Sequence, residues 1–121
     1  METNKGTQTD TDCCKMKSEK GYCPRPLEVA SDFLSKKWTM SIIITIGNFD
    51  HLRFNGLREK LERVTAKTLA DRLKELEKEG IVNRQSYNEI PPRVEYSLTK
   101  TGKQLMRALH PIIHWAERKR K

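Results

Sequence analysis

The chain has 121 residues, one third of them charged, and a formal net charge of +8. Its length allows one domain with a core of ordinary size. The first twenty residues carry four lysines and four acidic residues, so the whole basic excess falls on residues 21–121. Such a charge favours a polyanionic partner, nucleic acid before membrane, although solubility alone would also account for it. No run approaches the roughly 20 apolar residues of a membrane span, so we expect a cytoplasmic protein without a membrane partner.

Residues 1–21 are polar and rich in Thr, Lys and Asp, with almost nothing to bury. This composition predicts a disordered N-terminal tail, followed by one domain over residues 22–121. The tail has no apolar segment typical of a secretory signal. The three cysteines are odd in number and two are adjacent, Cys13 and Cys14, which does not suit a disulfide framework.

Two helices are expected next. Pro24 and Pro26 suit the first turn of a helix whose apolar residues, from Leu27 to Leu34, recur at helical spacing. A second helix begins at Trp38 and is apolar on most sides, which predicts a buried central helix. We expect Gly47 and Asn48 to stop it.

The middle of the chain predicts a pair of helices. Residues 53–55 are interpreted as a short extended piece, and residues 57–61 as a short helix. Thr65 is expected to cap the helix over residues 66–79, with Gly80 just past its end. The inner face of that helix is predicted to hold Ala66, Leu69, Leu73 and Leu76.

Two strands follow, over residues 81–87 and 94–98. Pro91 and Pro92 between them fit the tip of a hairpin, because proline lacks the N–H that a ladder needs, and Arg93 is expected to project at its shoulder. Thr99 is a predicted N-cap for the last helix, in which Pro111 should kink or divide the chain. Helices plus a hairpin make a mainly α fold with a small β-hairpin (α+β), a winged helix-turn-helix.

In a helix-turn-helix the second helix enters the major groove by its N-terminal end. The outer side of residues 66–79 carries Lys67, Asp71, Lys74 and Lys78, with Thr68, Arg72 and Glu75 on one flank. An isolated amphipathic helix with mixed charges usually only exposes its polar side to solvent. Here the order of short helix, turn, helix, strand and wing favours a DNA-binding helix. Arg53 and Arg84 are candidates for backbone contacts or surface ion pairs, and Arg93 for the minor groove or a phosphate. The predicted DNA contacts are Arg53, Thr65, Lys67, Thr68, Arg72, Arg84 and Arg93.

At these residues the sequence resembles the HxlR-type branch of winged-helix regulators, relatives of the MarR group. The resemblance covers residues 23 to about 116 and implies a homodimer on a pseudo-palindromic operator, most often a repressor. The first and last helices would pack across the two-fold axis, and their apolar residues exceed what one small core needs. The motifs that carry it are Cys23-Pro24, Lys37-Trp38, "RFNGL" at 53–57, "TLADRLKELEKEGIVNR" at 68–84, "PPRVEYSLTKTG" at 91–102 and Trp115.

Some members of that family sense oxidants or electrophiles through the cysteine that matches Cys23. Lys20, Arg25 and the start of a helix lie close to it in the sequence, and such groups lower the pKa of a thiol from about 8.5. An inert structural cysteine remains the alternative. Cys13 and Cys14 could resolve a sulfenate at Cys23 or do nothing.

No arrangement typical of catalysis is apparent, so we expect no enzyme and no cofactor. His110 and His114 are four residues apart, but Pro111 lies between them, and we expect no metal site. The alternative function is a winged helix that binds RNA or protein without operator specificity. Readers of single-stranded RNA usually present aromatic platforms, whereas Trp38, Phe54, Tyr96 and Trp115 occupy core-like positions in this pattern.

Overall fold

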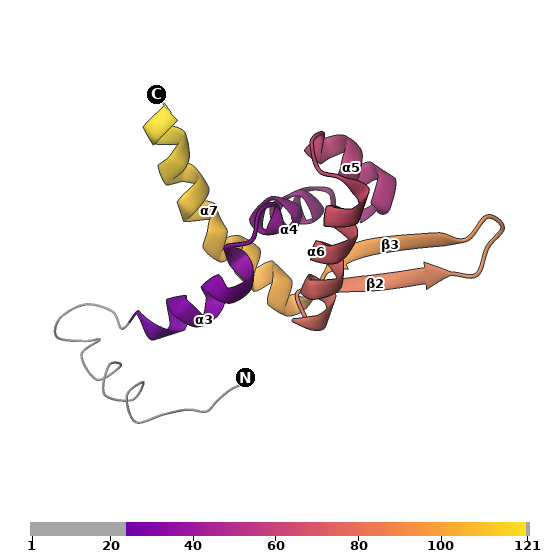
Figure 1. The fold of residues 1–121 in the computed structure, drawn as a ribbon, viewed down its shortest axis with the longest axis horizontal. Helices are drawn as coiled ribbons and strands as arrows, with labels where there is room; N and C mark the ends of the chain where they lie inside the picture. The colour runs from indigo at the N-terminus through magenta and orange to yellow at the C-terminus, as the bar shows by residue number, and fades with distance from the viewer. Residues whose placement is uncertain (1–23, 121) are drawn as a thin grey trace. The chain divides into compact units, whose positions relative to one another are not determined.

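The computed structural model describes residues 24–120. Helix α3 belongs to one compact unit, which ends at Ser35, and all the later elements belong to a second unit from Lys36 onward. The predicted tail over residues 1–21 and the three cysteines, Cys13, Cys14 and Cys23, lie outside the described residues. The elements in chain order are α3 (Arg25–Leu34), α4 (Thr39–Phe49), β1 (His51–Arg53), α5 (Phe54–Leu61), α6 (Ala66–Lys78), β2 (Val82–Tyr87), β3 (Arg93–Leu98) and α7 (Lys100–Arg120) (Figure 1).

Helix α3 begins as the prolines predict, with Pro24 at its N-cap and Pro26 in its first turn. None of its residues is buried. Leu27 and Val29 are among the most exposed large hydrophobic residues of the described chain. The helix therefore presents an apolar surface that the described part of its own unit leaves uncovered.

Helix α4 forms the centre of the second unit, as the sequence predicts. Ile42, Ile43 and Ile46 have no solvent-accessible surface. The prediction that Gly47 and Asn48 stop this helix is wrong, because α4 continues to Phe49. A Cβ at Gly47 would overlap the thioether of Met106 in α7, so the glycine serves the close approach of two helices.

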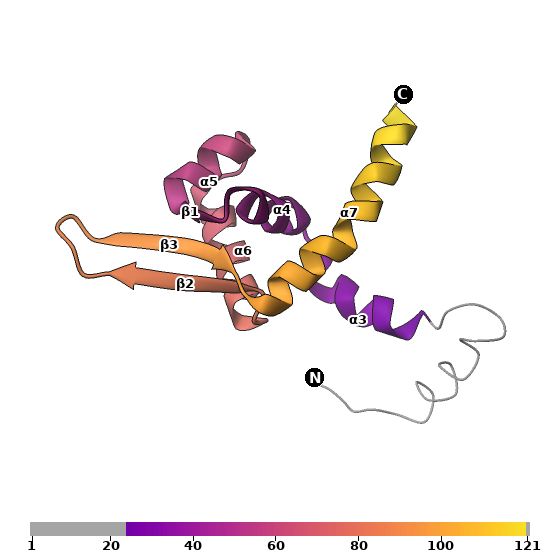
Figure 2. The same ribbon diagram turned by 180° about the vertical axis from the view of Figure 1, so that it is seen from behind.

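A three-stranded antiparallel sheet in the order β1-β3-β2 follows α4. The extended piece expected over residues 53–55 lies earlier in the chain, because β1 pairs His51 with Ser97 and Arg53 with Glu95, and α5 starts at Phe54. In the hairpin, β2 and β3 pair from Val82 and Leu98 out to Tyr87 and Arg93. Figures 1 and 2 show this hairpin projecting beyond α4, α5 and α6, as a wing does.

Helix α7 starts at the predicted cap, since the backbone N–H of Gly102 donates to Thr99 Oγ1 at 3.0 Å. It contains Pro111 and is not divided there, although Figure 2 shows its axis changing direction along its length. Trp115 is 56% exposed, so its core-like assignment is wrong for the single chain. None of the helices in the described part is long and apolar enough to cross a membrane.

Candidate nucleic-acid interface

The turn between α5 and α6 sets the start of the candidate reading helix. Thr65 has an extended backbone, and its Oγ1 accepts a hydrogen bond from the backbone N–H of Thr68 at 3.1 Å, which confirms the predicted cap. Leu69, Leu73 and Leu76 of α6 are buried. Ala66 is exposed, which corrects its predicted inward position, and Val64, just before the helix, is buried instead.

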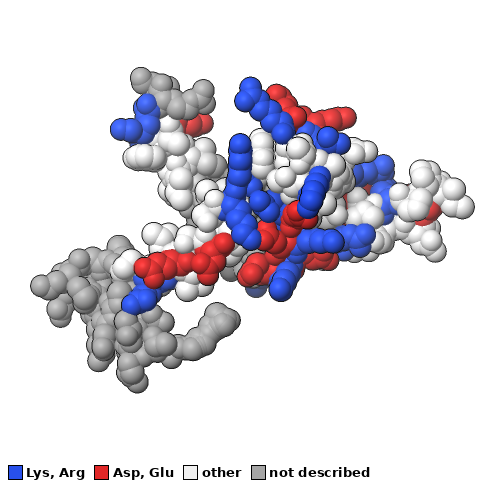
Figure 3. Space-filling model, in the orientation of Figure 1, with Lys and Arg blue, Asp and Glu red and all other residues white. Residues whose placement is uncertain are grey.

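The opposite face of α6 is open to solvent. The Lys67 side chain is 86% exposed, and its Nζ lies 3.2 Å from Oδ2 of Asp71 one turn later. Lys74 is also exposed and lies on the same face, seven residues after Lys67. We call Lys67, Asp71 and Lys74 the α6 face. Figure 3 shows lysines and arginines mixed with acidic side chains over this part of the second unit.

Arg72 does not belong to the α6 face. Its Nε donates to the backbone carbonyl of Lys37 at 3.1 Å, and its Nη1 lies 3.4 Å from Oε1 of Glu75. Its side chain is 22% exposed, and Lys36 pairs with the same carboxylate. Arg72 therefore fastens α6 to the segment that precedes α4, instead of reaching outward as the sequence predicts.

Arg93 also has partners inside the protein. Its Nη2 lies 3.1 Å from Oε2 of Glu89, its Nε lies 3.7 Å from Oε2 of Glu95, and its side chain is 27% exposed. The guanidinium stacks on Tyr87, 4.0 Å from the ring centroid. The structure therefore holds Arg93 against the wing, whereas the sequence predicts a projecting side chain. The sequence did not lead us to Tyr87 as a partner of Arg93. A hairpin whose tip spans residues 88–92 would have predicted it, because Tyr87 then pairs with residue 93.

The strand register separates the two other predicted arginines. Arg53 pairs with Glu95, and Arg84 pairs with Tyr96, the next residue of β3. Because successive residues of a strand point to opposite faces, Arg53 and Arg84 lie on different faces of the sheet. Arg84 is exposed, and its Nη1 donates to Oγ of Ser86 at 3.2 Å. The structure does not bring the predicted arginines together into one surface.

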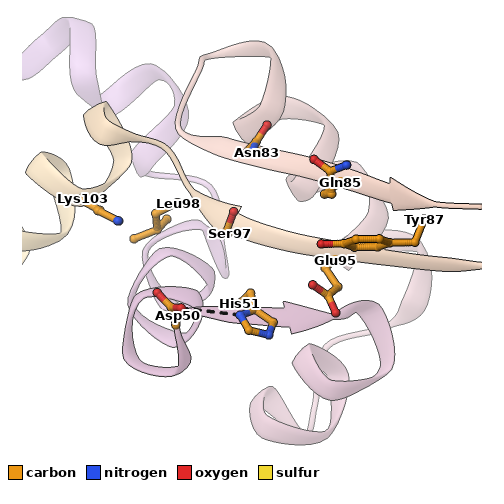
Figure 4. Close-up of a pocket in the computed structure, with 9 residues that line it drawn as sticks. All are labelled: Asp50, His51, Asn83, Gln85, Tyr87, Glu95, Ser97, Leu98 and Lys103. Carbon is orange, nitrogen blue, oxygen red and sulfur yellow. Dashed lines mark ion pairs between the residues drawn. The ribbon is translucent and has the colours of Figure 1, made fainter.

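The sheet face that carries Glu95 is hollowed. Figure 4 shows His51, Tyr87, Glu95 and Ser97 around a shared space, with Lys103 of α7 at one end. The hollow has a volume of about 360 Å³, and Asp50 Oδ2 lies 3.7 Å from His51 Nδ1 at its rim. It mixes both signs of charge and lies on the sheet face opposite to Arg84, so it is separate from the surface that Arg84 offers.

Comparison with known proteins decides the class. The model of the HxlR-like helix-turn-helix family matches residues 33–121, which include every element from α4 to α7. The chain belongs to the HxlR-like helix-turn-helix family. This result confirms the resemblance read from the sequence. Proteins of the family are transcriptional regulators and not enzymes.

Relatives of this HxlR-like regulator are named as transcriptional regulators, and the matched solved structures share its fold. The HTH-type transcriptional regulator YvaP of Bacillus subtilis (strain 168) is 44% identical over 94 residues, which cover 78% of this chain and 85% of YvaP. The reduced transcriptional regulator YodB from B. subtilis has 37% identity and a TM-score of 0.68, covering 78% of this chain and 91% of YodB. The reduced form of the redox regulator HypR has 34% identity and a TM-score of 0.74, with 79% and 94% of the two chains covered. The winged-helix fold predicted from the sequence is confirmed.

Proposed function

We propose that this chain is a sequence-specific DNA-binding regulator that acts as a homodimer, as a repressor, on a pseudo-palindromic operator. The observation that carries the proposal is the α6 face, where Lys67 is exposed in the first turn of a helix whose start Thr65 fixes. In a helix-turn-helix this end of the second helix lies in the major groove. Ammonium and hydroxyl groups there suit base edges and phosphates.

We divide the predicted contacts into two groups. We assign direct contacts to Lys67, Thr68, Lys74 and Arg84, with Thr65 holding the helix start against the phosphates. Arg72 and Arg93 have partners within the fold, so we assign them to positioning α6 and the wing. Arg53 lies on the sheet face opposite to Arg84 and is left out of this surface.

The homodimer is supported by apolar side chains that the single chain leaves in water. Leu27 and Val29 of α3 and Ile112 and Trp115 of α7 are all exposed. Burying apolar area is worth about 25 cal/mol per Å², so a second copy that covers these side chains would be favoured. We propose that α3 and α7 supply the dimer contacts.

A thiol response is a second proposal, favoured by the likeness to HypR, which is named a redox regulator. The candidate, Cys23, lies outside the described residues. Diamide should lower the DNA affinity of the wild type and leave Cys23→Ser unaffected. If diamide lowers the DNA affinity of both proteins equally, the response belongs to Cys13 and Cys14. If it lowers neither affinity, no cysteine is a sensor.

The test of DNA binding starts from a random-sequence pool. Wild-type protein should enrich a two-fold symmetric duplex, and Lys67→Ala should weaken binding to it by about 1 to 3 kcal/mol. Lys78→Ala is the matched control, because it removes the same charge from the same helix at the end that faces away from DNA. Equal losses of DNA affinity for both variants would mean that α6 contributes only a non-specific charge interaction with DNA. Preferential enrichment of RNA would support the alternative of an RNA-binding winged helix.

A further inference from the structure

The α6 face contains one acidic residue, Asp71, between its two lysines. The Asp71 side chain is 51% exposed, and its Oδ2 lies 3.2 Å from Nζ of Lys67, one turn earlier. Within residues 24–120 this carboxylate has no other hydrogen-bond or ion-pair partner. It therefore lies on the exposed side of α6, beside the lysine to which we assign a direct contact with DNA.

The stability of α6 does not account for this pair. The N-terminal end of a helix carries a partial positive charge, so acidic side chains stabilise the first turn and lysines do not. Helix α6 has the reverse order, because its first turn contains Lys67 and no acidic residue, and Asp71 follows four residues later. A lysine that precedes its carboxylate at this spacing forms the less favourable of the two possible pairs. The order of the charges therefore favours a role outside the helix itself.

The carboxylate also restricts what this surface can bind. It repels phosphate, so it lowers the affinity of the α6 face for DNA of unrelated sequence. In the major groove only two groups can donate to it, the N4 amino group of cytosine and the N6 amino group of adenine. Adenine has its N7 acceptor beside N6, where it repels a carboxylate, whereas the cytosine edge offers the donor alone. Cytosine is therefore the base that suits Asp71.

The spacing of the pair matches the edge of a C·G base pair. Cytosine N4 and guanine O6 both face the major groove and are joined by a hydrogen bond, which for N–H···O is about 2.9 Å long. Lys67 Nζ and Asp71 Oδ2 are 3.2 Å apart, so a donor and an acceptor lie side by side at nearly the same separation. An ammonium has three donors and a carboxylate has two acceptor oxygens, so both groups can bond the bases while they remain paired.

From these observations we infer that Lys67 and Asp71 together read one C·G base pair in each half-site. Asp71 accepts from cytosine N4, and Lys67 donates to guanine O6 or N7. A sequence without this cytosine leaves the carboxylate facing acceptors or phosphates, so Asp71 increases specificity by weakening the binding of other sequences. This inference rests on the proposed binding of α6 in the major groove.

The experiment uses the duplex that the wild type selects, with each symmetric pair of cytosines changed in turn. That duplex should contain a C·G pair at one symmetric position of each half-site. N4-methylcytosine there still pairs with guanine but presents a methyl group to the groove in place of the N–H. It should weaken binding of the wild type about tenfold and leave Asp71→Ala unaffected. Asp71→Asn should prefer adenine at this position, because the amide of asparagine bonds both N6 and N7 of adenine.

Glu77→Gln is the matched control, because it removes one negative charge from an exposed position of the same helix near the end that faces away from DNA. It should keep the wild-type preference for C·G. If Asp71→Asn keeps that preference, or binds every duplex more tightly by the same factor, Asp71 does not read a base. That result would overturn the inference and leave the proposed function standing. Failure of the wild type to select any duplex would overturn the proposed function, and the inference with it.

Discussion

At the scale of single residues, two cations on α6 have different tasks because their side chains have different partners. Arg72 donates to the carbonyl of Lys37, whereas Lys67 pairs with the exposed Asp71. Arg72→Ala should therefore lower the free energy of unfolding by about 1 to 3 kcal/mol, since it leaves polar partners unpaired. Lys67→Ala should change it by less than about 0.5 kcal/mol. Urea unfolding followed by circular dichroism measures both, and equal values for the two variants would contradict this division.

The carboxylates around Arg93 give a second residue-scale prediction. Glu89 lies 3.1 Å from the guanidinium, so Glu89→Gln leaves the wing with one uncompensated positive charge. Affinity for unrelated DNA should rise, and log affinity should fall more steeply with log salt by up to about one phosphate contact. Glu117→Gln on α7 is the control with the same change of charge. Fluorescence anisotropy measures the DNA affinity of both variants at a series of salt concentrations. If the wing never approaches DNA, the two variants should show the same salt dependence.

Residue roles were predictable where the interaction is local. Thr65 and Thr99 each cap a helix through an N–H three residues later, and both caps follow from the sequence. The partner of Arg72 is 35 residues away, and the contacts of Arg93 depend on the strand register. Spacing along the chain carries neither piece of information, so both side chains were predicted to be free. Lys74 was within reach of sequence reasoning, since it repeats the position of Lys67 after two turns.

At the scale of elements, two glycines in helices should respond to alanine in opposite ways. A Cβ at Gly102 would overlap the backbone carbonyl oxygen of Ile81, which cannot move without displacing the start of β2. Gly102→Ala should destabilise the fold by about 1 to 3 kcal/mol. At Gly56 the nearest atom is Leu52 Cδ2 at 3.5 Å, an ordinary contact, so Gly56→Ala should be neutral or stabilising by up to about 1 kcal/mol. Thermal unfolding compares them, and a tolerated Gly102→Ala would refute the close packing of α7 on this strand.

The elements themselves were largely predictable, and the exceptions share a cause. The buried α4, the capped α6 and the proline-tipped hairpin follow from periodicity and turn chemistry. The end of α4 and the place of β1 were mispredicted because both depend on tertiary contacts. Met106 of α7 packs against Gly47 within α4, and His51–Arg53 forms a strand by pairing with β3. Short segments of this kind are decided by their neighbours in space.

At the scale of the whole molecule, the exposed apolar side chains predict association. Trp115→Glu places a charge where we propose that two copies meet, so it should shift the protein from about twice the chain mass toward the monomer. Operator affinity should fall with it, because two linked half-sites gain from simultaneous binding. Sedimentation equilibrium gives the mass, and Ile90→Ser, which removes an exposed apolar side chain from the wing, should remain dimeric. A wild type that stays monomeric would refute the dimer.

The most direct test of the central claim, that two copies of α6 read the major groove, is dimethyl sulfate interference on the selected duplex. Methylation of guanine N7 blocks contacts in the major groove. Two symmetric clusters of interfering guanines should appear about one helical turn apart, roughly 34–36 Å, or a multiple of it. Lys67→Ala should lose the same guanine from both clusters. A single cluster, or a pattern that Lys67→Ala leaves unchanged, would contradict the account.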